Sequence, residues 1–428
     1  MNLIVDVPVV VRLAVAFCLG AMAGALVNLG VYRLAWRPRA ISPWSAPPKD
    51  APPRRWSDRV PILGWLGLRR ESGLHGRAFW VRPLLVELFA GAAAAWLYWW
   101  EVDREALLPA NLARPLTPAL LANLHAQYAC HGVLILLMAV ASLIDLDEKT
   151  IPDAVTVSGT LFGLAAAAWY PWCLLPVVQQ LPNGQEARGF LHLASPHDWP
   201  AWLAGFPQAW SLVVGLGCWW LWCVALLPRH WRFGLGWRRA AMLFWVGLVR
   251  EPITWRILGM GVAGSAAVAV VWLFGGVHWI GLLSALVGMA ASGGLVWAVR
   301  IIGAAVLRRE AMGFGDVTLM AMMGTLVGWQ TSLLVFFLAP LLAIANGLLA
   351  LILRREREIP YGPFLCMAGV LAIVGWDAIW SWAEGQVFVL GLWVPAILVF
   401  CLGAMAILLA LIDRIRQALF PSPEDQGR

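Results

Sequence analysis

The chain has 428 residues, of which 61% are hydrophobic and 13% are charged, and its mean hydropathy is +0.75. Soluble domains are about half apolar and about one quarter charged, so this composition excludes a water-soluble globular enzyme, a disordered chain and a coiled coil. The net charge of +7 comes from arginines in short segments between apolar runs. That distribution indicates membrane topology and not a nucleic-acid partner.

Long apolar runs dominate the chain. A helix needs about 20 apolar residues to cross a hydrocarbon core of about 30 Å. Candidate runs lie, in chain order, at about 9–34, 83–100, 128–146, 154–178, 207–228, 257–275, 279–306, 317–329, 331–353, 361–382 and 388–412. We therefore predict an all-α, polytopic transmembrane protein with about 9–11 spans. The run at 317–329 is too short to cross alone.

The loops between these runs predict the orientation. Residues 35–82 contain ten basic and three acidic residues, and such basic loops face the cytoplasm. Alternation from that loop places 101–127 outside, the N-terminus outside and the C-terminus in the cytoplasm. The first run is long and has no positive charge in front of it, so we expect a span and not a cleaved signal peptide.

Two further features of the sequence are not tied to a span. Residues 238–250 are apolar with arginines at both ends, which fits either a helix lying in the membrane interface or a marginal span. The seven cysteines fall mostly inside or beside apolar runs and form no C-x-x-C pair. We interpret them as small apolar residues and not as metal ligands or disulfides.

Two acidic residues stand out, because an ionisable group at membrane depth is costly and needs a reason. Asp145 lies at the predicted cytoplasmic end of the third run, and Asp316 at the predicted cytoplasmic start of the short eighth run. They are far apart in sequence, but the topology places both at one membrane face. Asp147 and Glu148 are interpreted as solvated boundary residues, and Asp377 as a polar packing contact.

A pair of aspartates at one membrane face can act as acid and base. Like charges at close range keep one carboxyl neutral while the other is ionised. The ionised carboxylate takes a proton from a water that attacks an amide carbonyl, and the neutral carboxyl donates to the oxyanion and then to the leaving amine. This chemistry needs no metal and no nucleophilic side chain. Asp145 and Asp316 are therefore the predicted catalytic pair.

The residues around both aspartates fit this role. Gly313 and Gly315 permit close backbone approach, so an extended substrate segment can pass against this strip. Asp316 is expected at a helix N-terminus, where the helix dipole favours its ionised form. Pro152 and Asp153 are expected in the first turn of the next helix, with Asp153 as a partner of the dipole.

Several stretches together resemble the type IV prepilin leader peptidases, the bacterial GxGD membrane aspartyl proteases. In this chain they are AGALVNLGVYRL (23–34), SDRVPILGWLGLRR (57–70), VRPLLVELFAG (81–91), IDLDEKTIPD (144–153), GFGDVTLMAMMGTLVGW (313–329) and IPYGPFL (359–365). They span most of the chain in the order of the family. The resemblance implies that Asp145 and Asp316 are the catalytic aspartates.

The resemblance also implies substrates and a place. The family removes short basic leaders from type IV pilin precursors and type II secretion pseudopilins at the cytoplasmic face of the bacterial inner membrane. Its bifunctional members then methylate the new N-terminus with S-adenosylmethionine. The expected partners are these precursors and the lipid bilayer. The sequence does not say which precursors are cut, or whether the chain self-associates.

Three departures from the family pattern bear on these implications. Where the family often has four zinc cysteines, this chain has Ser42, Ser45, Ser72 and His75. These residues cannot form a tetrahedral zinc site, so we expect no zinc, a loop held by packing, and methylation as an open question. Thr318 stands where the family has a lysine, for which Arg308 or Arg309 is a candidate substitute. Residues 170–280 are interpreted as an insertion with extra spans, either substrate-selecting or without a specific role.

The predicted organisation has three parts. Residues 1–126 form an N-terminal region with two spans and the 35–82 loop. Residues 127–365 form a peptidase core that the insertion interrupts, and residues 366–428 form the C-terminal spans and tail. A proton-coupled transporter is the alternative from another class, but it requires acids deep within spans and two matching halves. A catalytically inactive scaffold for pilus assembly is a second alternative.

Overall fold

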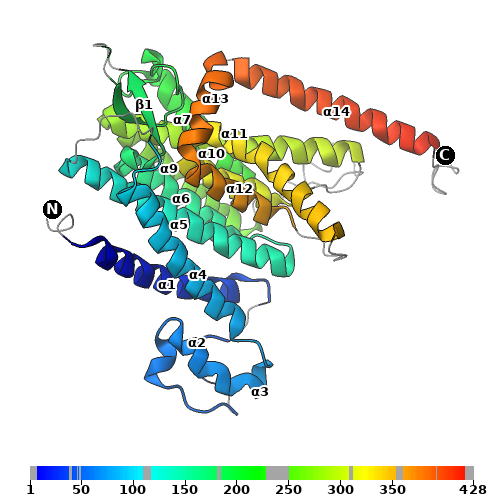
Figure 1. The fold of residues 1–428 in the computed structure, drawn as a ribbon. Helices are drawn as coiled ribbons and strands as arrows, with labels where there is room; N and C mark the ends of the chain where they lie inside the picture. Colours follow the sequence, from blue (N-terminus) through cyan, green and yellow to red (C-terminus); the bar gives the residue numbers. More distant parts are fainter. Residues whose placement is uncertain are drawn as a thin grey trace.

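A computed structural model describes residues 7–37, 41–45, 47, 50–108, 117–180, 184, 186–227, 250–307, 312–352, 360–391 and 393–419. These residues form helices packed side by side, with one antiparallel hairpin of β1 (Pro176–Gln180) and β2 (Glu186–Phe190) (Figure 1). The all-α polytopic fold is therefore confirmed. The chain is a multi-pass membrane protein, and the orientation of its termini stays a prediction.

Seven of the described helices are long and apolar enough to cross a membrane. They are α1 (Val9–Leu34), α4 (Val81–Tyr98, extended by a π-helical turn to Asp103), α5 (Pro118–Glu148), α9 (Pro252–Phe274), α10 (Gly276–Leu307), α11 (Phe314–Ile352) and α14 (Trp393–Leu419). The pair α12 (Gly362–Val374) and α13 (Trp376–Gln386) makes an eighth if it is counted as one span. Two more apolar helices, α6 (Asp153–Trp169) and α7 (Ala209–Ala225), have 17 residues each.

Among the described residues the long spans are fewer than the 9–11 predicted. The runs 154–178 and 207–228 contain helices of only 17 residues, α6 and α7, and two further runs differ in where their helices break. The runs 317–329 and 331–353 follow each other within α11, which is two helical segments separated at Gly328 (φ of +75°), beside the predicted boundary between the runs. The run 361–382 is divided into α12 and α13, which are bent by 90°. Hydropathy reports how apolar a segment is, but it does not report where a helix breaks or continues. Residues 238–249, of the predicted interfacial segment, lie outside the described residues.

The first half of α11 forms the centre of the molecule, where nearly every side chain from Asp316 to Val327 is buried. It packs against α6, α10 and α12. Gly288 of α10 and Gly324 of α11 face each other so closely that neither position has room for a Cβ atom. Small residues allow such close approach of membrane helices, so the helix that carries Asp316 is held on several sides.

The N-terminal region consists of α1 and α4, packed together, and the loop between them with its short helices α2 (Leu63–Leu68) and α3 (Ser72–His75) (Figure 1). Buried Glu87 of α4 fixes this loop. Its carboxylate accepts hydrogen bonds from the backbone N–H of Ile62 at 2.5 Å, the indole of Trp65 at 2.7 Å and the amide of Asn28 at 3.2 Å. Three donors satisfy a carboxylate that burial would otherwise make costly.

Residues 170–280 are predicted to be an insertion. Their described part begins with a cap over one end of the bundle, which we define as the described residues between 171 and 203. Core side chains hold the cap by its main chain: Gln330 donates to the carbonyl of His192 at 2.8 Å, Trp376 to that of Pro176 at 2.6 Å, and Trp279 to that of Leu203 at 3.0 Å. The cap also binds Gln127, near the start of α5. Asp145 lies 18 residues further along that helix, or about 27 Å away.

Candidate active site

Asp145 lies in the last turn of α5. Its side chain is buried, with 5% of the residue exposed, and its carboxylate accepts a hydrogen bond from the backbone N–H of Gly362. The helix ends three residues later, where Lys149 adopts the left-handed conformation and its N–H bonds the carbonyl of Asp145 at 2.8 Å. The chain therefore turns away immediately after Asp145.

Asp316 lies in the first turn of α11 and is 8% exposed. Its carboxylate accepts a hydrogen bond from the backbone N–H of Gly313, just before the helix. The positive end of the helix dipole also favours a negative charge at this position. Each aspartate is thus held by a backbone donor from a glycine.

The structure brings Asp145 and Asp316 together, close enough for the charge of one carboxyl to act on the other. The thiol of Cys366, on α12, lies near both, since both charges act on it. Three segments far apart in sequence therefore meet at one place: the end of α5, the start of α11 and the start of α12. The topology derived from the arginines predicted the first two at one face.

Ile151 joins these three segments. A Cβ atom added at Gly315 would lie 2.7 Å from Cβ of Ile151, and one added at Gly362 would lie 3.0 Å from its Cδ1 and 2.5 Å from a carboxylate oxygen of Asp145. Both positions therefore require glycine. Gly315 is covered by Ile151, so it serves the packing of the site; Gly313 is exposed and is the part of the strip still open to a substrate.

Arg300 is a residue of this site that the sequence did not indicate. It extends from α10, and its Nε donates to the carbonyl of Met312 at 2.9 Å, while its guanidinium lies 5.8 Å from the ring centre of Phe314. It therefore fixes the backbone just before Asp316. Its only signal in the sequence is a lone arginine inside the apolar run 279–306.

Comparison with known proteins finds two family models that match parts of the chain. A sequence model of the "Type IV leader peptidase family" matches residues 242–348, and one of the "Bacterial Peptidase A24 N-terminal domain" matches residues 18–101. Two separate parts of the chain are thus similar to the type IV leader peptidase family. The first match contains Asp316 and neither contains Asp145, so the place of Asp145 rests on the geometry.

Curated relatives of the family carry the name "Prepilin leader peptidase/N-methyltransferase". The protein of Pseudomonas aeruginosa is 32% identical, and the match covers 36% of this chain and 57% of that protein. The protein of Stutzerimonas stutzeri is 29% identical, and the match covers 35% of this chain and 54% of that protein. The Aeromonas hydrophila protein is 32% identical over 24% of this chain and 34% of its own length. The chain thus spans little more than half of the first two relatives. No solved structure matches.

The position of the family's lysine is filled differently here. Thr318 is buried, and its hydroxyl donates to the carbonyl of Gly315 at 3.0 Å, within the first turn of α11. Arg308 and Arg309, the predicted substitutes, lie outside the described residues. The cation that does contact the segment before Asp316 in the described structure is Arg300.

The helix after Asp145 begins close to the predicted residue. Asp153 is the first residue of α6, and Pro152 is its N-cap, one position earlier than the first turn predicted for it. Asp153 is exposed and lies in the first helical turn, where a negative charge interacts favourably with the dipole. These residues shape the turn that presents Ile151 to the glycines.

Asp147 is exposed and Glu148 is half-buried, as expected of residues at the membrane boundary, but both also make contacts that the sequence did not indicate. Glu148 accepts the backbone N–H groups of Trp36 and Arg37 at 2.6 and 3.1 Å. Asp147 accepts two hydrogen bonds from one nitrogen of Arg82, at 2.7 and 2.8 Å. The residues next to Asp145 therefore tie the ends of α1 and α4 to α5, which hydropathy and charge patterns do not reveal.

The four positions that correspond to zinc cysteines do not fit a zinc site. The Ser42 hydroxyl accepts from the backbone N–H of Trp44, and Ser72 donates to a neighbouring carbonyl, so both make local contacts. His75 faces Glu71 at 3.6 Å, and Glu71 also pairs with Arg54 at 2.8 Å. A hydroxyl is a poor zinc ligand beside thiolate and imidazole. In the described part of this loop, ion pairs hold the segments that a metal would join.

Proposed function

We propose that this chain is a membrane-embedded aspartic endopeptidase that removes leader peptides from type IV prepilin-like or type II secretion pseudopilin precursors. The reaction takes place at the cytoplasmic face of the bacterial inner membrane. The observation that carries the proposal is the meeting of Asp145 and Asp316, two buried carboxyls from distant segments. The similarity to the family models and the names of the relatives support it.

The geometry suits a water-activating pair. Two adjacent carboxyls share one proton, because both cannot be ionised at short range. The ionised carboxyl accepts a proton from water, whose oxygen forms the new bond to the scissile carbonyl carbon. The neutral carboxyl donates its proton to the carbonyl oxygen as it becomes negative. The carboxyl that accepted the proton from water then gives it to the leaving amine as the C–N bond breaks, and the hydroxyl proton returns to the other carboxylate as the carbonyl re-forms. The backbone donors of Gly362 and Gly313 stabilise whichever carboxyl is charged.

The experiment replaces each aspartate by asparagine in the full-length protein in membranes. Asp145→Asn and Asp316→Asn should each lower the rate of leader removal by about 10³-fold or more, because an amide neither accepts the proton of water nor supplies one to the leaving amine. Gel mobility of a prepilin precursor reports cleavage, and membrane levels of the protein report insertion. Asp377→Asn, on α13, is the matched control and should cleave normally. Normal cleavage by either site variant would remove the assignment.

Methylation of the new N-terminus is a second candidate function. It is favoured by the match of residues 18–101 to the N-terminal domain and by the names of the relatives. S-adenosylmethionine would supply the methyl group; no residues of this chain are assigned to hold it, and zinc is not expected in the 35–82 loop. Transfer of tritium from labelled S-adenosylmethionine to the processed precursor tests this activity separately. Cleavage of the precursor without transfer of the methyl group would mean that the chain is a peptidase only.

The alternatives are less well supported. A proton-coupled transporter needs acids near the membrane midplane, whereas Asp145 and Asp316 lie in the terminal turns of their helices. An inactive scaffold for pilus assembly would show no cleavage by the unchanged protein in the assay above. Precursor proteins and the lipid bilayer are the proposed partners, with no nucleic acid.

A further inference from the structure

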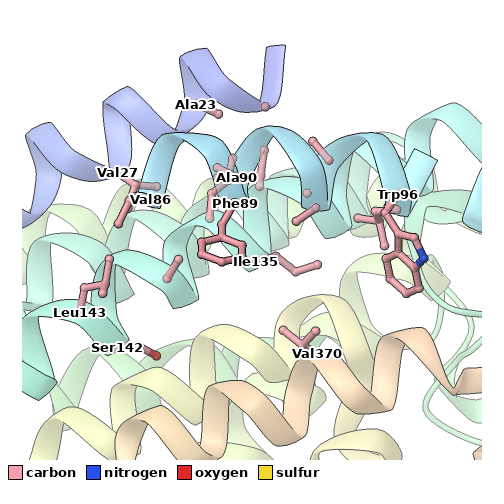
Figure 2. Close-up of a pocket in the computed structure, with 18 of the residues that line it drawn as sticks. Ala23, Val27, Val86, Phe89, Ala90, Trp96, Ile135, Ser142, Leu143 and Val370 are labelled. Atoms are coloured by element: carbon pink, nitrogen blue, oxygen red, sulfur yellow. The ribbon is translucent and has the colours of Figure 1, made fainter. Parts of the chain in front are cut away.

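A large apolar groove lies between the N-terminal helices and the core. Its volume is about 900 Å³, and its walls come from α1, α4 and α5, with two residues of α12. Figure 2 shows Phe89 of α4, Ile135 of α5 and Val370 of α12 around this space. Phe89 is 67% exposed, so the groove is open at the side and not enclosed by protein.

The groove has the length of a membrane-embedded helix. It follows α5 from Tyr128 to Leu143, a distance of about 22 Å at 1.5 Å per residue. The hydrocarbon core is about 30 Å thick, so the groove extends over most of a span. An occupant can therefore lie parallel to α5 for about four turns.

The walls are rich in small residues, among them Ala93 on α4 and Ala129, Gly132 and Ala139 on α5. A Cβ atom added at Gly132 would meet no atom within 4 Å, so this part of α5 faces open space. Small residues are typical of surfaces against which transmembrane helices pack, because they let two backbones approach closely. A lipid chain has no such requirement.

One end of the groove reaches the candidate active site. Ser142 lines that end and lies one turn before Asp145 on the same helix. Its hydroxyl is hydrogen-bonded to Cys366, the thiol that lies near both aspartates. Arg82, paired with Asp147, lines the same end, so the groove changes there from apolar to charged. The groove therefore ends close to the aspartates, one helical turn before Asp145.

We propose that this groove binds an apolar transmembrane helix of the substrate and places the peptide bond at the end of that helix against Asp145 and Asp316. This inference rests on the proposed function and adds how the substrate is held. It follows that recognition depends on the apolar helix as well as on the sequence around the cleaved bond. Bound lipid is the competing occupant.

Cross-linking tests the occupant without requiring activity. The photoreactive analogue p-benzoylphenylalanine replaces Phe89, and separately Phe400 of α14, which is 76% exposed and does not line the groove. Both variants carry Asp316→Asn to prevent turnover. The probe is a precursor with a basic leader and a 20-residue apolar helix. Cross-links from position 89 to the precursor helix, with few from position 400, are expected. Equal yields, or lipid adducts only, would overturn the inference.

Filling the groove tests its role in turnover. Gly132→Trp places an indole in the open space, and Gly403→Trp, at an exposed position of α14 with no atom within 4 Å of a Cβ, is the matched control. The substrates are the same precursor and a peptide that ends before the helix. Gly132→Trp should lower kcat/KM for the precursor by about ten-fold or more and leave the peptide within about two-fold.

The outcomes separate this inference from the proposed function. If the unchanged protein cleaves neither substrate, the proposed function fails, while the cross-links still decide the groove. If it cleaves both and Gly132→Trp cleaves the precursor normally, the groove inference fails and the proposed function stands. An equal loss with both substrates would also overturn it, because that loss would come from damage to the active site and not from exclusion of the helix.

Discussion

Two groups of buried carboxylates in this protein have opposite surroundings. In the 35–82 loop, Asp58 is bonded by the guanidinium of Arg70, and beside the loop Glu87 of α4 is bonded by three neutral donors. At the candidate active site, Asp145 and Asp316 each receive a backbone donor and lie beside another acid. A carboxylate with its donors satisfied stabilises a fold, whereas two acids side by side hold a proton ready for transfer.

The largest effect should come from the active-site pair, and it should not be additive. Each single asparagine variant is expected to lose about 10³-fold in cleavage rate, and the double variant should be no slower than the worse single variant, because the carboxyls act as one unit. Single-turnover rates of the three variants on one prepilin precursor give the comparison. Losses that multiply would mean that the two residues act independently.

Arg300 should have a smaller effect on the same reaction. Arg300→Gln removes the charged donor to Met312 and is expected to lower kcat by about ten-fold with little change in KM, because it positions the segment before Asp316 without touching the substrate. Arg300→Lys should restore part of the rate. An increase in KM at constant kcat would instead assign Arg300 to substrate binding.

Breaking the pair in the loop should affect stability more than chemistry. The guanidinium of Arg70 holds the pKa of Asp58 below its usual value, so the pair stabilises the loop fully above about pH 4, the pKa of a free aspartate, and the stabilisation is lost as pH falls through the lowered value. Asp58→Asn should cost about 2 kcal/mol and remove this acid transition. Limited proteolysis of the loop between pH 3 and 7 measures both effects.

Substitutions that loosen the cap should have the smallest effect on cleavage of the changes considered. Gln330→Ala removes the donor shared by the carbonyls of His192, Leu193 and Ser195, and should lower the free energy of unfolding by about 1–3 kcal/mol. Because the cap lies at the far end of α5 from Asp145, the cleavage rate at 25 °C should stay unchanged. Thermal unfolding in detergent measures the loss of stability, and a parallel rate assay measures any loss of cleavage. A rate loss comparable to that of Arg300→Gln would show coupling between the ends.

The candidate site was predictable from sequence in part. Asp145 and Asp316 could be found because acids beside apolar runs are rare and because the arginines predict one membrane face for both. Arg300 could not be found, since a lone arginine in a span has no pattern to distinguish it. The partners of Asp147 and Glu148 are residues far away in the sequence, so local composition indicated their exposure to solvent but not these contacts.

The sequence by itself determined the helical membrane class, the motifs of the family and the two acids, because hydropathy, charge and short motifs are local properties of the chain. Only the tertiary structure decided how Ile151 and Gly362 close the site, where the α12–α13 pair bends, and that a groove lined by small side chains ends near Asp145. These features depend on how closely helices from different parts of the chain approach each other. That distance is set by packing between residues that are far apart in the sequence.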